Sequence, residues 1–88
     1  AQATDLGATA TGASANAGNQ YATATGYGAQ ATGYASTATG YAAVASGESS
    51  IAMGDIAEAS GDFSSASGFN SLADSDFATA SGANSAAL

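Results

Sequence analysis

Small residues recur along this chain with a period of seven, and the period predicts its secondary structure. Alanine occupies every seventh position without exception, at residues 3, 10, 17, 24, 31, 38, 45, 52, 59, 66, 73, 80 and 87. The residue two places before each of these alanines is always Ala or Ser. Because residues two apart project from the same face of a β-strand, each heptad predicts one short strand with a face of small residues.

Glycine marks the end of most of these strands, two residues after the alanine. It stands there at Gly12, Gly26, Gly33, Gly40, Gly47, Gly54, Gly61, Gly68 and Gly82. Three other copies carry Asp5, Asn19 and Ser75 instead. We expect these glycines to supply the positive φ of a tight turn, with Asn and Asp as the usual substitutes and Ser75 as the weakest fit.

Two consecutive heptads predict a coil of 14 residues, built as strand, turn, strand, turn. Coils stacked as a parallel solenoid lie ~4.8 Å apart, so about six coils should extend on the order of 29 Å. The two sheets would face each other through Ala and Ser only, and should lie closer than the ~10 Å of an ordinary sandwich. A heptad coiled coil is excluded, because the Leu or Ile stripe is missing and each interior glycine would cost about 1 kcal/mol.

The doubled period separates two outward-facing surfaces. The uncharged face carries Thr9, Thr11, Thr23, Thr25, Thr37, Thr39, Ile51, Met53, Ser65, Ser67, Thr79 and Ser81. The mixed face carries Gln2, Thr4, Asn16, Gly18, Gln30, Thr32, Val44, Ser46, Glu58, Ser60, Leu72 and Asp74. We predict that the uncharged face is buried against other copies of the chain and that the mixed face meets solvent.

Composition supports a fold that other copies complete. The 88 residues can form one domain, yet Leu, Ile, Val and Phe together number only nine. A single copy would therefore bury little apolar surface, while the regular spacing argues against disorder. The chain begins and ends within a repeat, so we expect residues 1–88 to be one segment of a longer repeat array.

Charge and missing residue types narrow the chemistry. The chain has no Lys, Arg, His or Cys and a net charge of −7, so nucleic acid is not an expected partner. No apolar run is long enough to span a bilayer, and no direct membrane contact is expected. Only seven carboxylates and four tyrosines could act as acid or base, so we predict no enzyme and no cofactor. The segment Asp74-Ser75-Asp76 begins like a calcium loop but lacks its Gly and terminal Glu, so no metal site is predicted.

One stretch carries a family resemblance. The segment Ser50-Ile51-Ala52-Met53-Gly54, followed by Ala57-x-Ala59-x-Gly61, resembles the head repeats of YadA-like trimeric autotransporter adhesins, and the likeness covers essentially the whole chain. The resemblance implies a left-handed parallel β-roll, assembled as a homotrimer on the surface of Gram-negative bacteria, beyond the outer membrane. It also implies a virulence-associated, non-catalytic head that attaches the cell to host cells or extracellular matrix, with the stalk, neck and membrane anchor absent from this segment.

The sequence departs from that family on the uncharged face. The family favours Val and Ile at these positions, whereas here only Ile51 and Met53 are large and apolar. We therefore expect a partly hydrated trimer axis, with a dry plug at these two residues.

Stacking also aligns the turn residues into two edges. The acidic edge contains Tyr34, Glu48, Asp62, Phe63, Asp76 and Phe77. The aromatic edge contains Tyr27, Tyr41, Asp55 and Phe69. Each edge has two interpretations. The acidic edge is either a solvated rim or a ridge that binds a cation or a basic partner. The rings of the aromatic edge either pack on the roll and its neighbours or contact host ligands.

Two other functions remain open from the sequence. The Thr-x-Thr ladder at Thr9, Thr23 and Thr37 resembles the flat faces of ice-binding solenoids, although Ile51 interrupts it. The chain is also compatible with a structural spacer inside a longer adhesin whose ligand-binding element lies elsewhere.

Overall fold

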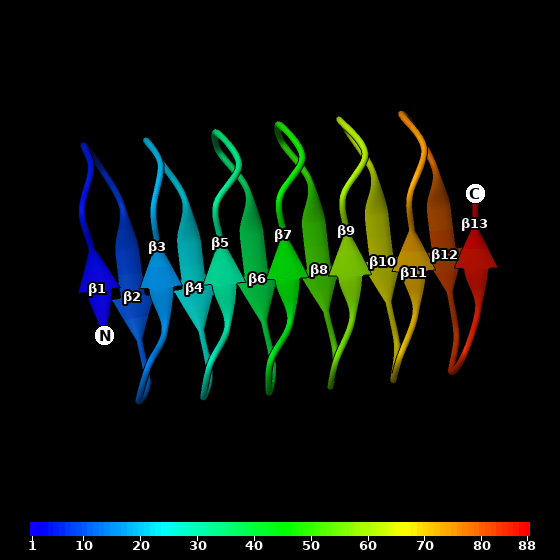
Figure 1. Ribbon diagram of the computed structural model, residues 1–88, viewed down its shortest axis with the longest axis horizontal. Coiled ribbons are helices and arrows are strands. Elements are labelled where there is room, and N and C mark those ends of the chain that lie inside the picture. Colours follow the sequence, from blue (N-terminus) through cyan, green and yellow to red (C-terminus); the bar gives the residue numbers. More distant parts are fainter.

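The computed structural model describes residues 1–88 and contains two parallel β-sheets (Figure 1). The seven-stranded sheet contains β1 (Gln2–Ala3), β3 (Asn16–Ala17), β5 (Gln30–Ala31), β7 (Val44–Ala45), β9 (Glu58–Ala59), β11 (Leu72–Ala73) and β13 (Ala86–Ala87). The six-stranded sheet contains β2 (Thr9–Thr11), β4 (Thr23–Thr25), β6 (Thr37–Thr39), β8 (Ile51–Met53), β10 (Ser65–Ser67) and β12 (Thr79–Ser81). No helix in the structure could cross a membrane.

The strand register confirms the 14-residue coil. In the six-stranded sheet Ala24 pairs with Ala38, and in the seven-stranded sheet Ala31 pairs with Ala45. The nearer strands in Figure 1 point upward and the more distant strands point downward, while the chain advances from left to right. The Cα atoms extend over 30 × 21 × 10 Å, so the predicted length and thinness of the roll are also confirmed.

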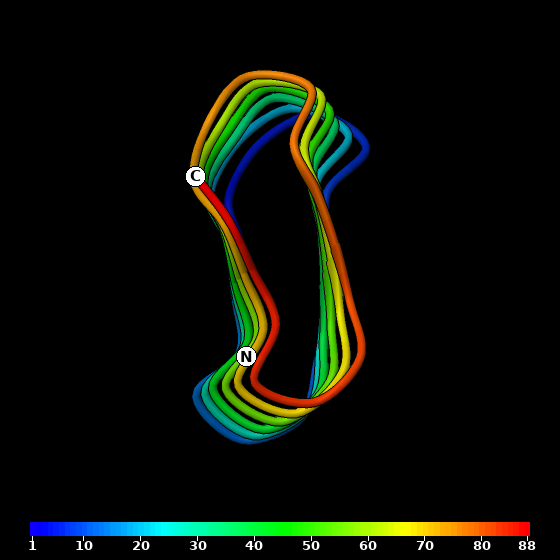
Figure 2. The same ribbon diagram turned by 90° about the vertical axis from the view of Figure 1, so that its right-hand side faces the viewer.

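The interior of the roll consists of small side chains. Fifteen buried alanines form the core, and Ser36, Ser50, Ser64 and Ser71 are buried beside them. Seen along the roll in Figure 2, the coils superpose as a flattened ring with the sheets along its long sides. The prediction of a core made only of Ala and Ser is confirmed.

Each buried serine hydroxyl bonds within its own turn. Ser50 Oγ donates to the carbonyl of Gly47 over 2.7 Å, and Ser36 Oγ donates to Gly33 in the same way. No buried side-chain polar atom lacks a hydrogen-bond partner. Serine can therefore replace alanine in this core without leaving an unpaired hydroxyl.

The turns correct one prediction about backbone conformation. The residue with positive φ at every turn is the seventh of the heptad, namely Gly7, Ser14, Tyr21, Gly28, Ala35, Ala42, Ser49, Ile56, Phe63, Asn70, Phe77 and Asn84. The following residue donates its N–H back to the fifth, as Ala57 does to Gly54 over 3.3 Å, in the pattern of a type II turn. The N–H of the seventh residue meanwhile bonds to the preceding coil, as Ile56 does to Tyr41.

The glycines at the fifth position therefore have two different roles. Those that follow the six-stranded sheet, such as Gly40 and Gly54, do have positive φ. Gly33, Gly47 and Gly61, which follow the seven-stranded sheet, do not, so the φ explanation is wrong for them. A Cβ on any of these three would overlap the carbonyl group of the next coil, so space rather than conformation requires glycine there.

The substitutes at this position act through their side chains. Neither Asp5 nor Asn19 has positive φ, contrary to expectation. Instead Asp5 Oδ1 accepts the N–H of Leu6 and Asn19 Oδ1 accepts the N–H of Gln20, each over 2.8 Å. These bonds stabilise the start of the turn, whose left-handed residue is still the seventh of the heptad, Gly7 or Tyr21.

Candidate functional site

The molecule presents faces and edges rather than a cavity. Its surface has no pocket, and no three His, Cys, Asp or Glu side chains lie close enough to hold a metal ion. Candidate functional residues therefore lie on two broad faces and on the two rows of turns that join them.

The uncharged face is one continuous surface along the six-stranded sheet. Its side chains alternate with the buried alanines, and equivalent residues pair in register from coil to coil, as Thr23 does with Thr37. Ile51 and Met53, both on β8, are 39% and 49% exposed in the single chain. The structure thus brings together all twelve residues that the sequence assigned to this face, and their burial in a trimer stays a prediction.

The mixed face covers the seven-stranded sheet on the opposite side. It carries the carboxylates of Glu58 and Asp74, and Ser60 Oγ donates to Asp74 Oδ1 over 2.6 Å. The mixed face therefore differs from the uncharged face by two negative charges, although both faces cover the same alanine core.

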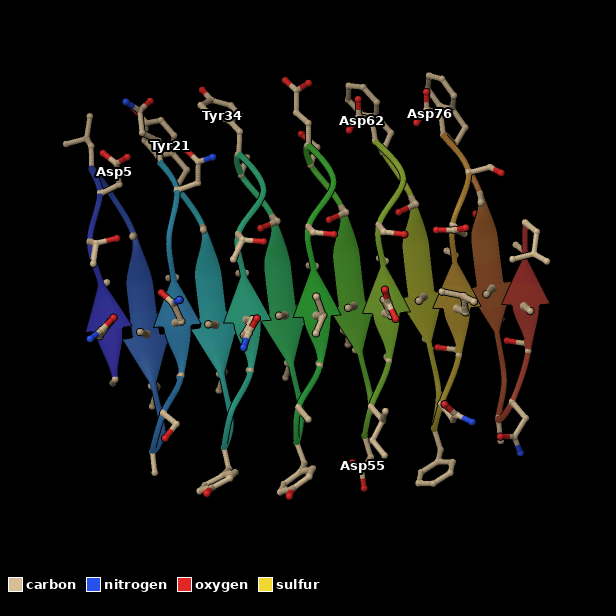
Figure 3. All side chains as sticks on the ribbon, in the orientation of Figure 1. Asp5, Tyr21, Tyr34, Asp55, Asp62 and Asp76 are labelled. Atoms are coloured by element: carbon tan, nitrogen blue, oxygen red, sulfur yellow. The ribbon has the colours of Figure 1, made fainter.

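The acidic edge carries hydrogen bonds that the sequence did not reveal. Figure 3 shows Tyr34, Asp62 and Asp76 along one edge of the roll. Asp62 Oδ1 accepts the N–H of Glu48 over 3.0 Å, and Asp76 Oδ1 accepts the N–H of Asp62 over 3.1 Å. Two of the three carboxylates therefore bond the backbone of the preceding coil, in addition to facing solvent.

Aromatic pairs also lie on this edge. Phe63 and Phe77 stack with their centroids 5.4 Å apart and an angle of 8° between their planes. Tyr21 meets Tyr34 edge-on, with the centroids 5.9 Å apart. Sequence reasoning missed Tyr21, because it looked for partners 14 residues apart and this pair joins the seventh residue of one heptad to the sixth of a later one.

The aromatic edge lies along the other row of turns, where Figure 3 labels Asp55. Tyr27 and Tyr41 stack at 5.4 Å with an angle of 9° between their planes. Tyr41 and Phe69 are 56% and 51% exposed, and Asp55 occupies the coil between them. The structure therefore contains exposed rings along this edge, as predicted, and their role in ligand contact stays a prediction.

Comparison with known families accounts for the repeat. The model of the YadA head domain repeat, which spans two copies, matches residues 17–43, 31–57, 45–71 and 59–85. The chain belongs to this family. Successive matches advance by 14 residues, so the matches to the YadA head repeat and the structural coil have the same period.

Membership of the YadA head repeat family indicates the general function of these surfaces. YadA head repeats are repeats of bacterial surface adhesins, a class not known for catalysis. No curated protein sequence matches the chain. The faces and edges described above are therefore those of a YadA head, whose general role is adhesion.

Proposed function

We propose that this chain is the head of a trimeric adhesin, exposed beyond the outer membrane of a Gram-negative bacterium, that attaches the cell to a host cell or extracellular matrix. The observation that carries the proposal is the YadA head repeat match from residue 17 to residue 85. A surface with half-exposed aromatic ladders and no pocket supports it, since broad contacts of this kind suit macromolecular partners.

The proposed assembly is a homotrimer of left-handed rolls with the uncharged faces turned toward a common axis. The winding in Figure 1 supports the handedness, and the absence of charge on twelve consecutive outward positions supports burial of that face. Residues 1–88 form one repeat array within the head. Three copies of each edge would then act together, so that weak individual contacts add up to strong attachment.

Adhesion is tested by solid-phase binding of the folded protein to collagen, fibronectin, laminin and cultured cells. We expect binding to at least one of these surfaces, and Tyr27→Ala combined with Tyr41→Ala should weaken it while the trimer persists. Tyr21→Ala combined with Tyr34→Ala is the matched control, because it removes two rings from the other edge. Uniform absence of binding would contradict the adhesive role and leave the segment as a structural spacer.

One observation favours a second candidate. Strands β2, β4 and β6 place Thr9, Thr23 and Thr37 in one in-register row, with Thr11, Thr25 and Thr39 in a second. Such a flat threonine array on a solvent-exposed sheet would suit ice binding. The proposed trimer would bury this same face, so thermal hysteresis from the folded protein would replace the adhesin proposal.

A further inference from the structure

Three consecutive turns of the aromatic edge place a carboxylate between two aromatic rings. Tyr41, Asp55 and Phe69 are the sixth residues of turns that stack directly on one another. The N–H of Ile56 bonds to Tyr41 O and that of Asn70 bonds to Asp55 O, both over 2.8 Å. Two coil spacings separate the backbones of Tyr41 and Phe69 by about 9.5 Å. We call the surface formed by Tyr41, Asp55 and Phe69 the Asp55 notch, because a short side chain stands there between two long ones; it is not a pocket.

The Asp55 carboxylate has no hydrogen-bond partner within the chain. The carboxylates of Asp5, Asp62, Asp74 and Asp76 each accept a backbone N–H or a hydroxyl. Glu48, Asp55 and Glu58 accept none, and of these only Asp55 has an aromatic residue at the equivalent turn position of both neighbouring coils, namely Tyr41 and Phe69. Its negative charge is thus available to a partner and is flanked by ring surface.

The surroundings of Asp55 are apolar. Tyr27 stacks against Tyr41 from the preceding coil, whereas the next coil presents no ring to Tyr41. Beside Asp55, Ile56 is 47% exposed and has a φ of 61°, an unfavourable conformation for a β-branched residue. The turn therefore places an aliphatic side chain next to the carboxylate at the surface.

We propose that this notch binds a lysine or arginine side chain of a partner protein. The cationic head would pair with Asp55 and lie against the rings of Tyr41 and Phe69, since cations are attracted to aromatic faces. The methylene stem would pack on Ile56, as long basic side chains do on apolar surface. A metal ion is a poor alternative, because Ca²⁺ requires six to eight oxygen ligands and the notch supplies one carboxylate.

The partner is not another copy of this segment. The 88 residues contain no Lys, Arg or His, so neither a trimer neighbour nor a second head segment of this sequence can fill the notch. This inference rests on the proposed adhesive function, because it specifies the chemistry of a contact on the aromatic edge.

The test uses a capped hexapeptide of alternating glycine and arginine as the probe, at low ionic strength. Nuclear magnetic resonance should show shifts of the Tyr41 and Phe69 ring signals, and a peptide with citrulline in place of arginine should bind much more weakly. Asp55→Asn should lower the affinity about five- to tenfold, given typical exposed cation–π and ion-pair strengths. Glu58→Gln is the matched control, because it removes an equally unpaired charge from the mixed face and should change the affinity less than about twofold.

Equal losses in the two variants would overturn the inference in favour of diffuse attraction to the net negative charge, and so would equal binding of the citrulline peptide. The adhesion assay separates the two proposals. If the protein adheres and Asp55→Asn adheres equally well, the notch fails while the adhesive function stands. If the arginine peptide binds at Asp55 but the protein adheres to no surface, the notch stands and the adhesive function fails.

Discussion

At the scale of single residues, the turns of this roll are limited by the space available for a Cβ atom at each position. The seventh position of each heptad adopts a left-handed conformation with Tyr, Phe, Ile, Ala, Ser, Asn or Gly, and from Tyr21 onward its N–H bonds to the preceding coil. The fifth position at Gly33, Gly47 and Gly61 is far stricter, since any Cβ meets the next coil. Steric access therefore constrains these turns more than conformational preference does.

Gly47→Ala should consequently destabilise the protein by several kcal/mol, on the order of the largest single-substitution effects. Gly28→Ala should be much milder, because a Cβ there has its nearest neighbour 4.0 Å away and Ala35 and Ala42 occupy equivalent positions. Urea unfolding followed by circular dichroism gives both values. Similar losses in the two variants would contradict a specific steric requirement for glycine at residue 47.

At the scale of strands, two or three residues are enough because every strand except the four at the ends of the sheets is paired on both sides. Strands this short would be unstable alone, but those inside the array exchange hydrogen bonds with the coils before and after. Fifteen alanines between the sheets are buried, and the whole roll is only 10 Å thick across its Cα atoms. The interior therefore has no space for a larger side chain.

Ala45→Val tests this tight interior. Ala45 is 0% exposed on β7, and two added methyl groups should destabilise the protein by about 1–3 kcal/mol through overpacking. Ser46→Val, at the exposed position just after β7, should be close to neutral, since its side chain lies outside the packed interior. The midpoint temperatures of thermal unfolding of the two variants are compared. An unchanged midpoint in Ala45→Val would mean that the two sheets can move apart to accept a larger side chain.

At the scale of the whole molecule, the roll has two unlike sides. The uncharged face carries Ile51 and Met53 partly exposed, while the mixed face carries Glu58 and Asp74. An alanine core contributes little hydrophobic free energy, since each methyl group is worth about 0.8 kcal/mol. Association through the uncharged face would add the burial that the thin interior lacks.

Met53→Asp should therefore abolish the proposed trimer. Three carboxylates would meet near the axis without a cation in the chain to neutralise them, and burying unpaired charge is strongly unfavourable. Ser46→Asp adds the same charge to the mixed face and should leave the trimer intact. Size-exclusion chromatography with light scattering measures the mass, and an unchanged trimer in Met53→Asp would place the uncharged face outside the interface.

The sequence by itself determined the strands, the 14-residue coil, the alanine core and the division into two faces. Each of these follows from periodicity, because a side chain's direction in a stacked coil depends only on its position in the repeat. Only the tertiary structure decided the steric contacts, ring pairs and hydrogen bonds between neighbouring coils. It placed a left-handed residue at the seventh position of every turn and gave Gly47 a steric role. It also paired Tyr21 with Tyr34 and left the Asp55 carboxylate without a hydrogen bond, whereas four other carboxylates accept one. These features arise from distances between coils, which a one-dimensional repeat does not contain.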